Sequence, residues 1–152
     1  MHDEENASAA AAAAWFANPH SRGSAHLCVD DRECYRTLGN AQIPWGAPGA
    51  NRFGFHIEQA GFARWSSAIW KSHLLTLRRG AYKAALHCHA FGIPPQFVSA
   101  RGLRLGVKGI TTHAECTKAF GGDHTDPGLF WPRRLFMSYV RRYYGELATS
   151  AL

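Results

Sequence analysis

The chain has 152 residues, of which 46% are hydrophobic and 18% are charged, so it resembles one folded domain rather than a disordered protein. Its formal net charge of +6 favours an anionic partner without selecting one, because the lysines and arginines are dispersed. No apolar run reaches the ~20 residues that span a bilayer, so we expect no stable membrane insertion. No nucleic-acid recognition motif accompanies the positive charge, so nucleic acid is not an expected partner.

The first elements in chain order are a helix, a hairpin and a strand. The alanine-rich segment 6–18 predicts a helix that Pro19 ends. Segments 24–29 and 34–38 predict a hairpin around the polar turn 30–33, and 39–51 a loop. The alternating segment 53–60 predicts a strand that puts His56 and Glu58 on one face.

The second half of the chain begins with a long helix, which apolar residues at helical spacing predict over 66–90. Short strands are expected at 97–99 and 109–113, with a basic loop at 101–108 between them. A turn of helix is expected within 114–120, a loop at 121–128 and a last helix at 132–144. Alternating strands and helices predict an α/β domain with a mixed central β-sheet flanked by helices.

The cysteines do not predict a disulfide scaffold. Cys28, Cys34, Cys88 and Cys116 form no C-x-x-C pair, and Cys28 and Cys34 flank the polar turn. We therefore expect reduced thiols. The alanine stretch follows acidic rather than basic residues, so we expect no secretory signal, and action outside the membrane would require release by another agent.

A candidate metal site is indicated by His113, at the end of a β-like run, and Asp126, which precedes Pro127 and Gly128 in a turn. Imidazole and carboxylate are zinc ligands, and a catalytic zinc needs three protein ligands with one open position. From spacing alone, the favoured interpretation is that Asp126 caps its own turn and His113 packs at a sheet edge. Cys116 offers an alternative H-x-x-C pair with His113, whereas His87 and His89 are expected to be surface or core residues.

Seven segments in fixed order carry a resemblance to a known family. They are residues 1–5 (MHDEE), 15–16 (WF), 24–26 (SAH), 45 and 47–51 (W, APGAN), 57–58 and 60–61 (IE, AG), 109–115 (GITTHAE) and 124–128 (HTDPG). The chain resembles the zinc-dependent N-acetylmuramoyl-L-alanine amidases, whose fold is that of peptidoglycan recognition proteins, and above all the amidase domains of actinobacteriophage endolysins. The resemblance implies a catalytic domain over 1–145, a C-terminal tail at 146–152 and a first strand that is missing or truncated ahead of His2.

The resemblance also implies the site. His2, His113 and Asp126 would bind Zn²⁺, Glu58 would orient or deprotonate the water, and His124 would assist at the scissile carbonyl. His26, Trp45, Asn51 and His56 would contact the substrate, although the tyrosine that many relatives carry before the hairpin histidine is Ala25 here.

The implied activity is hydrolysis, by zinc-activated water, of the amide bond between N-acetylmuramic acid and the L-alanine of the stem peptide. Bacterial peptidoglycan would be the partner, and a monomer is expected. The alternatives are a peptidoglycan-binding module without catalysis and a zinc peptidase acting on the stem peptide.

Overall fold

A mixed four-stranded sheet forms the centre of the computed structural model, which describes residues 1–6 and 8–150. The strand order is β1-β4-β2-β3; β1 and β2 run parallel to β4, and β3 pairs antiparallel with β2. The predicted fold class is confirmed, and the first strand consists of two residues. The strands are β1 (His2–Asp3), β2 (Leu27–Val29), β3 (Cys34–Arg36) and β4 (Ile57–Gln59).

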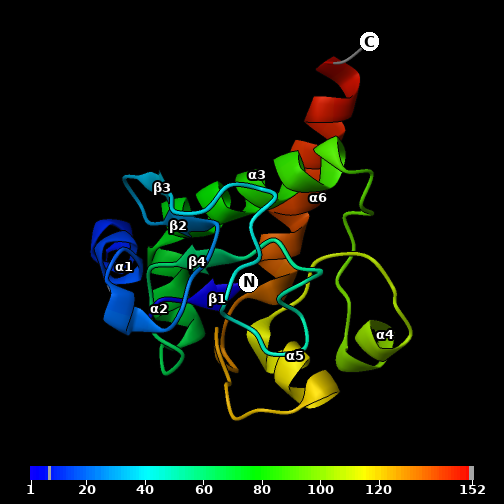
Figure 1. Ribbon diagram of the computed structural model, residues 1–152. Coiled ribbons are helices and arrows are strands. Elements are labelled where there is room, and N and C mark those ends of the chain that lie inside the picture. Colours follow the sequence, from blue (N-terminus) through cyan, green and yellow to red (C-terminus); the bar gives the residue numbers. More distant parts are fainter. Residues whose placement is uncertain (7, 151–152) are drawn as a thin grey trace.

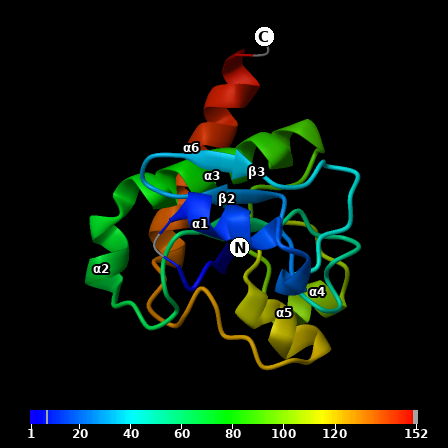
Figure 2. The same cartoon turned by 60° about the vertical axis from the view of Figure 1, so that its left-hand side comes forward.

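Helices pack on both faces of this sheet (Figures 1 and 2). Leu27, Val29 and Ile57 belong to the main hydrophobic cluster with α3 and α6, whereas Cys28 packs with α1 on the opposite face. The helices are α1 (Ala9–Phe16), the 3-10 turn η1 (Pro19–Ser21), α2 (Ser67–Ser72), α3 (Leu74–Ala90), α4 (Ala100–Arg104), α5 (His113–Phe120) and α6 (Arg133–Ser150).

Strand register places three side chains in one row. His2 lies opposite Glu58 in the β1–β4 pair, and Cys28 lies opposite Glu58 in the β2–β4 pair. Because side chains alternate between the two faces of a strand, this row lies on the face away from α3. The register therefore brings Glu58 beside His2.

The expected helix over 66–90 is interrupted at His73, whose φ of −96° and ψ of 49° are not helical. Asp31, in the turn of the β2–β3 hairpin, explains the break. Its Oδ2 lies 2.7 Å from His73 Nδ1, and its Oδ1 accepts hydrogen bonds from the Thr76 N–H at 2.7 Å and the Thr76 hydroxyl at 3.0 Å. A distant carboxylate thus caps α3, whose own N-cap residue makes no side-chain cap.

The expected strands at 97–99 and 109–113 are wrong, because only an isolated bridge joins Phe97 to Ile110. Serine and threonine caps convert the neighbouring segments into helices: Ser99 caps α4 within the expected loop 101–108, and Thr112 caps α5. His113 is consequently the first residue of a helix rather than the last residue of a strand.

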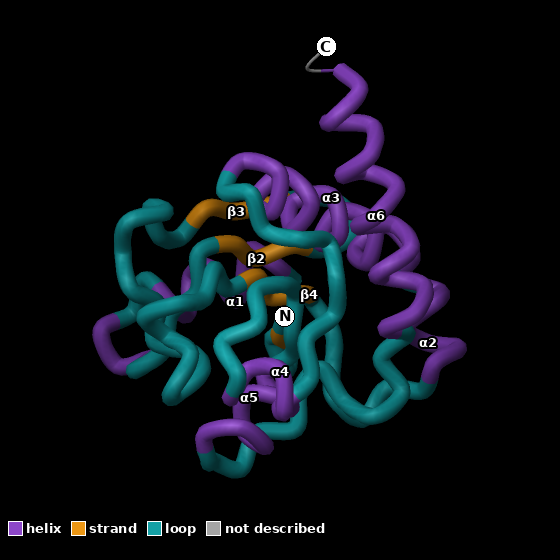
Figure 3. Tube along the Cα trace, turned by 90° about the vertical axis from the view of Figure 1, so that its right-hand side faces the viewer, coloured by secondary structure: helices purple, strands orange, loops and turns teal. Residues whose placement is uncertain are grey.

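Helix ends also differ from expectation. α1 begins only after its N-cap Ser8, and α6 continues through residues 146–150, which were expected to be a tail. The end of α6 extends away from the rest of the molecule (Figure 3). Residues 151–152 lie outside the described part of the chain. None of the described helices is long and apolar enough to cross a membrane.

Candidate metal centre

Three side chains from distant parts of the sequence meet at one edge of the sheet. His2 is held by the pairing of β1 with β4, His113 by the start of α5, and Asp126 by the following loop. Backbone hydrogen bonds tie these segments together: the His113 N–H donates to the Met1 carbonyl at 3.1 Å, and the Ala114 N–H donates to the Asp126 carbonyl at 2.9 Å. The fold therefore fixes the relative positions of the three side chains.

The donor atoms of these side chains are spaced as zinc ligands would be. His2 Nδ1 lies 3.1 Å from His113 Nδ1 and 3.2 Å from Asp126 Oδ2, and His113 Nδ1 lies 2.9 Å from Asp126 Oδ1. Tetrahedral ligands at zinc-bond lengths of about 2.0–2.2 Å would be about 3.3–3.6 Å apart. A small expansion of the cluster would therefore admit the ion. The side chains of His2, His113 and Asp126 form the group of potential metal ligands found among the described residues.

Burial and protonation also suit a cation. His2 and His113 are each 4% exposed and Asp126 is 8% exposed, and Asp126 Oδ2 makes no hydrogen bond within the described structure. Burial lowers the pKa of His2 to about 4, which leaves the neutral imidazole that metals bind. Burial acts to raise the pKa of Asp126, but His113 and His2 hold it below its usual value. A buried carboxylate oxygen that receives no hydrogen bond is stabilised when a cation binds to it.

Glu58 lies next to this cluster. Its Oε1 is 3.9 Å from His2 Nδ1, and its buried Oε2 has no hydrogen-bond partner among the described residues. Burial, followed by the nearby charge of Asp126, raises the pKa of Glu58 well above its ordinary value. A carboxyl group in this environment has the raised proton affinity expected of a general base.

His124 lies at the outer edge of the cluster. Its ring stacks on His113 at 4.2 Å between centroids, and its Nδ1 is 3.7 Å from Asp126 Oδ1. Its side chain is 59% exposed, in contrast to the buried histidines. His124 can therefore meet a substrate that approaches from solvent.

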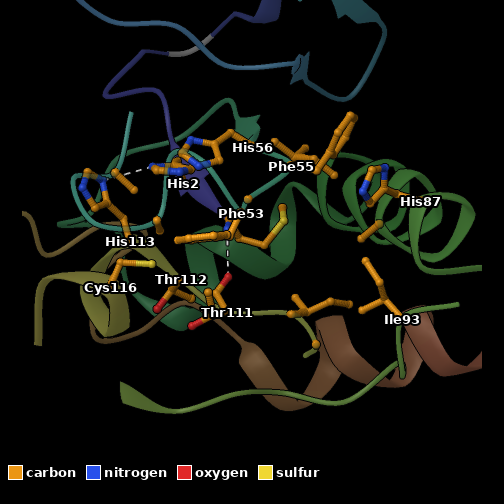
Figure 4. A pocket seen from close by; sticks show the side chains of 18 of the residues that line it. His2, Phe53, Phe55, His56, His87, Ile93, Thr111, Thr112, His113 and Cys116 are labelled. Carbon is orange, nitrogen blue, oxygen red and sulfur yellow. Dashed lines mark hydrogen bonds between the residues drawn. The ribbon is translucent and has the colours of Figure 1, made fainter. Parts of the chain in front are cut away.

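A cavity of about 130 Å³ opens beside His2 and His113. Figure 4 shows His2, His56 and His113 at one end of this cavity and His87 and Ile93 at the other. The ring of His56 lies 4.9 Å from that of His2, and burial lowers its pKa. Gly46 and Gly54 make room for this ring, because a Cβ at either position would lie within 3.0 Å of it.

Three residues expected to bind substrate have other contacts in the structure. His26 is 2% exposed; its Nδ1 accepts the His56 N–H at 3.0 Å, so its Nε2 donates to the Gln42 carbonyl at 3.1 Å. Asn51 Oδ1 accepts hydrogen bonds from the N–H groups of Gly46 and Ala47, which folds its own loop. Trp45 is 70% exposed. None of the three lines the cavity beside His2 and His113.

Other cavity residues were not expected from the sequence. Phe53, Phe55 and His87 line the cavity, and the Phe55 ring stacks between His26 at 4.4 Å and His87 at 4.0 Å. His87 could have been assigned to this face from its helical spacing to Ala84, which also lines the cavity. Cys116 lines the cavity as well, but it is not one of the three clustered ligands.

Comparisons with known proteins agree with this architecture. The model of the N-acetylmuramoyl-L-alanine amidase family matches residues 1–129. The Staphylococcus aureus hydrolase AmiA, solved in complex with its ligand, superposes with a TM-score of 0.75 at 18% identity, covering 94% of this chain and 70% of that one. The catalytic domain of XlyA superposes with a TM-score of 0.63 at 20% identity, covering 91% of this chain and 82% of that one. No curated protein sequence matches.

The fold is thus that of these two solved structures, and the buried cluster lies at its sheet edge. With most of its length matched by the family model, the chain belongs to the N-acetylmuramoyl-L-alanine amidase family. This membership confirms the prediction of a peptidoglycan amidase.

Proposed function

We propose that this chain is a zinc-dependent amidase that cleaves the bond between N-acetylmuramic acid and the L-alanine of the stem peptide. The observation that carries the proposal is the convergence of His2, His113 and Asp126, whose ligand atoms all lie within 4.8 Å of one another. Membership of the amidase family supplies the bond that is cut.

Zinc bound at this cluster would supply a Lewis acid for the scissile carbonyl and lower the pKa of water. The residues of the chain provide the rest of the chemistry. Glu58 would accept the proton of the attacking water and pass it to the leaving L-alanine amine. His124, at the exposed edge of the cluster, would donate a hydrogen bond to the oxygen that gains negative charge.

His56 is proposed as a substrate contact at the cavity wall. Its ring is held between Gly46 and Gly54, and its backbone N–H is fixed by His26. His26 would then act by positioning His56. Trp45 and Asn51 would border the substrate path from the loop that Asn51 organises.

Zinc content tests the metal site. The purified chain should bind one zinc ion, lose activity on chelation and recover it when zinc is added. Glu58→Ala should abolish turnover and leave zinc bound, whereas Asp126→Ala should lose the zinc. A fully active Glu58→Ala variant would remove Glu58 from the mechanism.

Two rival functions are separated by simple measurements. A binding module would hold peptidoglycan without releasing product, and a zinc peptidase would leave the lactyl–alanine bond intact. The amidase releases free lactyl carboxylates on muramic acid, which mass spectrometry of digested walls detects.

The resemblance to actinobacteriophage endolysins supports phage lysis as the setting, with action at the bacterial wall after release from the host cytoplasm. Clearing of actinobacterial cells by protein added from outside, measured as loss of turbidity, tests the bacteriolytic role. The expectation of a monomer is tested by light scattering during size-exclusion chromatography.

A further inference from the structure

A second and larger hollow lies behind the metal-binding loop. This groove has a volume of about 810 Å³ and is bordered by the start of α5, residues 125–132 and the start of α6. Thr112 is common to the lining of the groove and of the cavity beside the metal ligands. Because the groove includes Pro127, it adjoins the segment that carries Asp126 without being part of the metal centre.

The groove is positively charged. Lys71, Lys118, Arg133 and Arg134 line it, and Glu115 is the acidic residue among its described lining. Glu115 is already engaged: Oε1 lies 2.8 Å from Lys118 Nζ, and Oε2 accepts the Ala100 N–H at 2.7 Å. Among the described residues, no carboxylate pairs with Lys71, Arg133 or Arg134. Arg133 already lies over the Phe97 ring, 4.6 Å from its centroid, so Lys71 and Arg134 are the cations available to an anionic ligand.

The backbone adds to this positive potential. Arg133 and Arg134 occupy the first turn of α6, where the helix dipole is positive, and that turn contains no acidic residue. Pro132, which precedes the helix, has no side-chain acceptor, and no described residue accepts a hydrogen bond from the N–H groups of Arg134 and Leu135. Positively charged side chains at the positive end of a helix lower the stability of the free protein. An anion bound there would offset this repulsion.

The groove also has apolar surface. Leu129 is 89% exposed and Phe130 is 55% exposed, both at the groove. Trp131 lines the groove at 6% exposure, and its indole N–H has no acceptor in the described structure. A suitable ligand thus combines carboxylates with alkyl groups.

We propose that this groove binds an acidic peptide that also carries alkyl groups, namely a second stem peptide of the wall. Its carboxylates would pair with Arg134 and Lys71, and its alkyl groups would contact Leu129 and Phe130. The choice of occupant rests on the proposed function, because a stem peptide with free carboxylates is part of that substrate. The groove would be a second point of attachment to the wall, beside the loop that carries Asp126.

The probe is the synthetic tetrapeptide L-Ala–γ-D-Glu–diaminopimelate–D-Ala, titrated calorimetrically into the zinc-loaded full chain at low salt. Arg134→Glu should weaken binding at least about ten-fold, since it removes a charge-assisted contact and adds repulsion. Arg141→Glu is the matched control, because Arg141 is exposed on the same helix outside the groove, and it should bind like the unchanged protein. Amidation of the peptide carboxylates should weaken binding as strongly as Arg134→Glu.

The indole N–H signals in a nitrogen–proton correlation spectrum locate the bound peptide. The Trp131 signal should shift on titration, and the signal of Trp15 on α1 should not. Equal binding by Arg134→Glu and the unchanged protein, or a Trp131 signal that stays in place, would overturn the proposal. So would binding of a single-stranded oligonucleotide in preference to the tetrapeptide.

Two measurements separate this proposal from the amidase itself. Arg134→Glu should cleave a soluble muropeptide at the unchanged rate, because Arg134 is not in the metal centre. If the unchanged protein fails to cleave the muropeptide, the proposed function fails, and the titration still reports whether the groove binds peptide. A melting temperature of Arg134→Glu at or above that of the unchanged protein shows that lost binding is not lost folding, as expected for an acidic residue at a helix start.

Discussion

Gly128→Ala should damage both the stability of the fold and the metal centre. Gly128 has a φ of +91°, and a Cβ built there would lie 2.0 Å from the Ala63 carbonyl oxygen. The positive φ alone costs an alanine about 1–2 kcal/mol. The contact is with backbone rather than with a flexible side chain, so the chain must move by about 1.4 Å to reach an ordinary van der Waals distance.

Together these effects should cost about 2–4 kcal/mol, within the range of severe single substitutions. For a domain of this length that corresponds to a fall in melting temperature of about 5–15 °C. Because Asp126 lies two residues before Gly128, the same displacement should weaken zinc binding at least about ten-fold, since metal ligands tolerate only about 0.5 Å of misplacement.

Thermal unfolding with chelator present isolates the effect on the fold, and a competitive zinc indicator measures the effect on the site. Gly145→Ala is the control, since nothing lies within 4 Å of a Cβ at this position inside α6. It should raise stability by about 0.5–1 kcal/mol. If Gly128→Ala unfolded at the same temperature as the unchanged protein and bound zinc as tightly, the steric reasoning would be refuted.

Three further predictions follow from the site and the hairpin. Glu58→Gln should lower the rate of amide hydrolysis by at least about a hundred-fold with zinc content unchanged, and a drop in zinc content instead would make Glu58 a ligand. His113→Ala should bind zinc at least about a hundred-fold more weakly, and retention of stoichiometric zinc after dialysis would argue against the site. Asp31→Ala should lose about 1–2 kcal/mol of stability at neutral pH, because the N-terminus of α3 loses its cap; a variant as stable as the unchanged protein would contradict this. Burial acts to raise the pKa of Asp31, but the hydrogen bonds from His73 and Thr76 hold it below its usual 3.8, so the stability difference should be present above about pH 5 and vanish as the pH falls below about 4.

The ordered motifs predicted the fold class and grouped His2, His113 and Asp126, which the structure brings together, but local patterns misassigned the element that carries His113. The β-branched run before it favours a strand. The threonine at 112 with a glutamate at 115 also matches a capping-box pattern, and the Thr112 hydroxyl does accept the Glu115 N–H. Reading that signal would have placed His113 at a helix start.

Other features could not be read from local sequence, because they depend on contacts across the fold. Asp31 interrupts the helix at His73 from 42 residues away, and Phe55 stacks on His87 from another element. His26 and Asn51 were expected to touch substrate, and the sequence did not reveal that their polar atoms also accept hydrogen bonds from backbone N–H groups. The identity of a residue in the sequence does not distinguish a side chain that stabilises a loop from one that binds a ligand.

The carboxylate of Asp31 couples two elements that are far apart along the chain. Since the Thr76 N–H donates to it, that amide can exchange its hydrogen with water only when the hairpin turn moves away from α3. The exchange rate of this one amide therefore reports how often the hairpin detaches. It measures how often the sheet edge formed by β3 opens, and the measurement does not perturb the candidate metal centre.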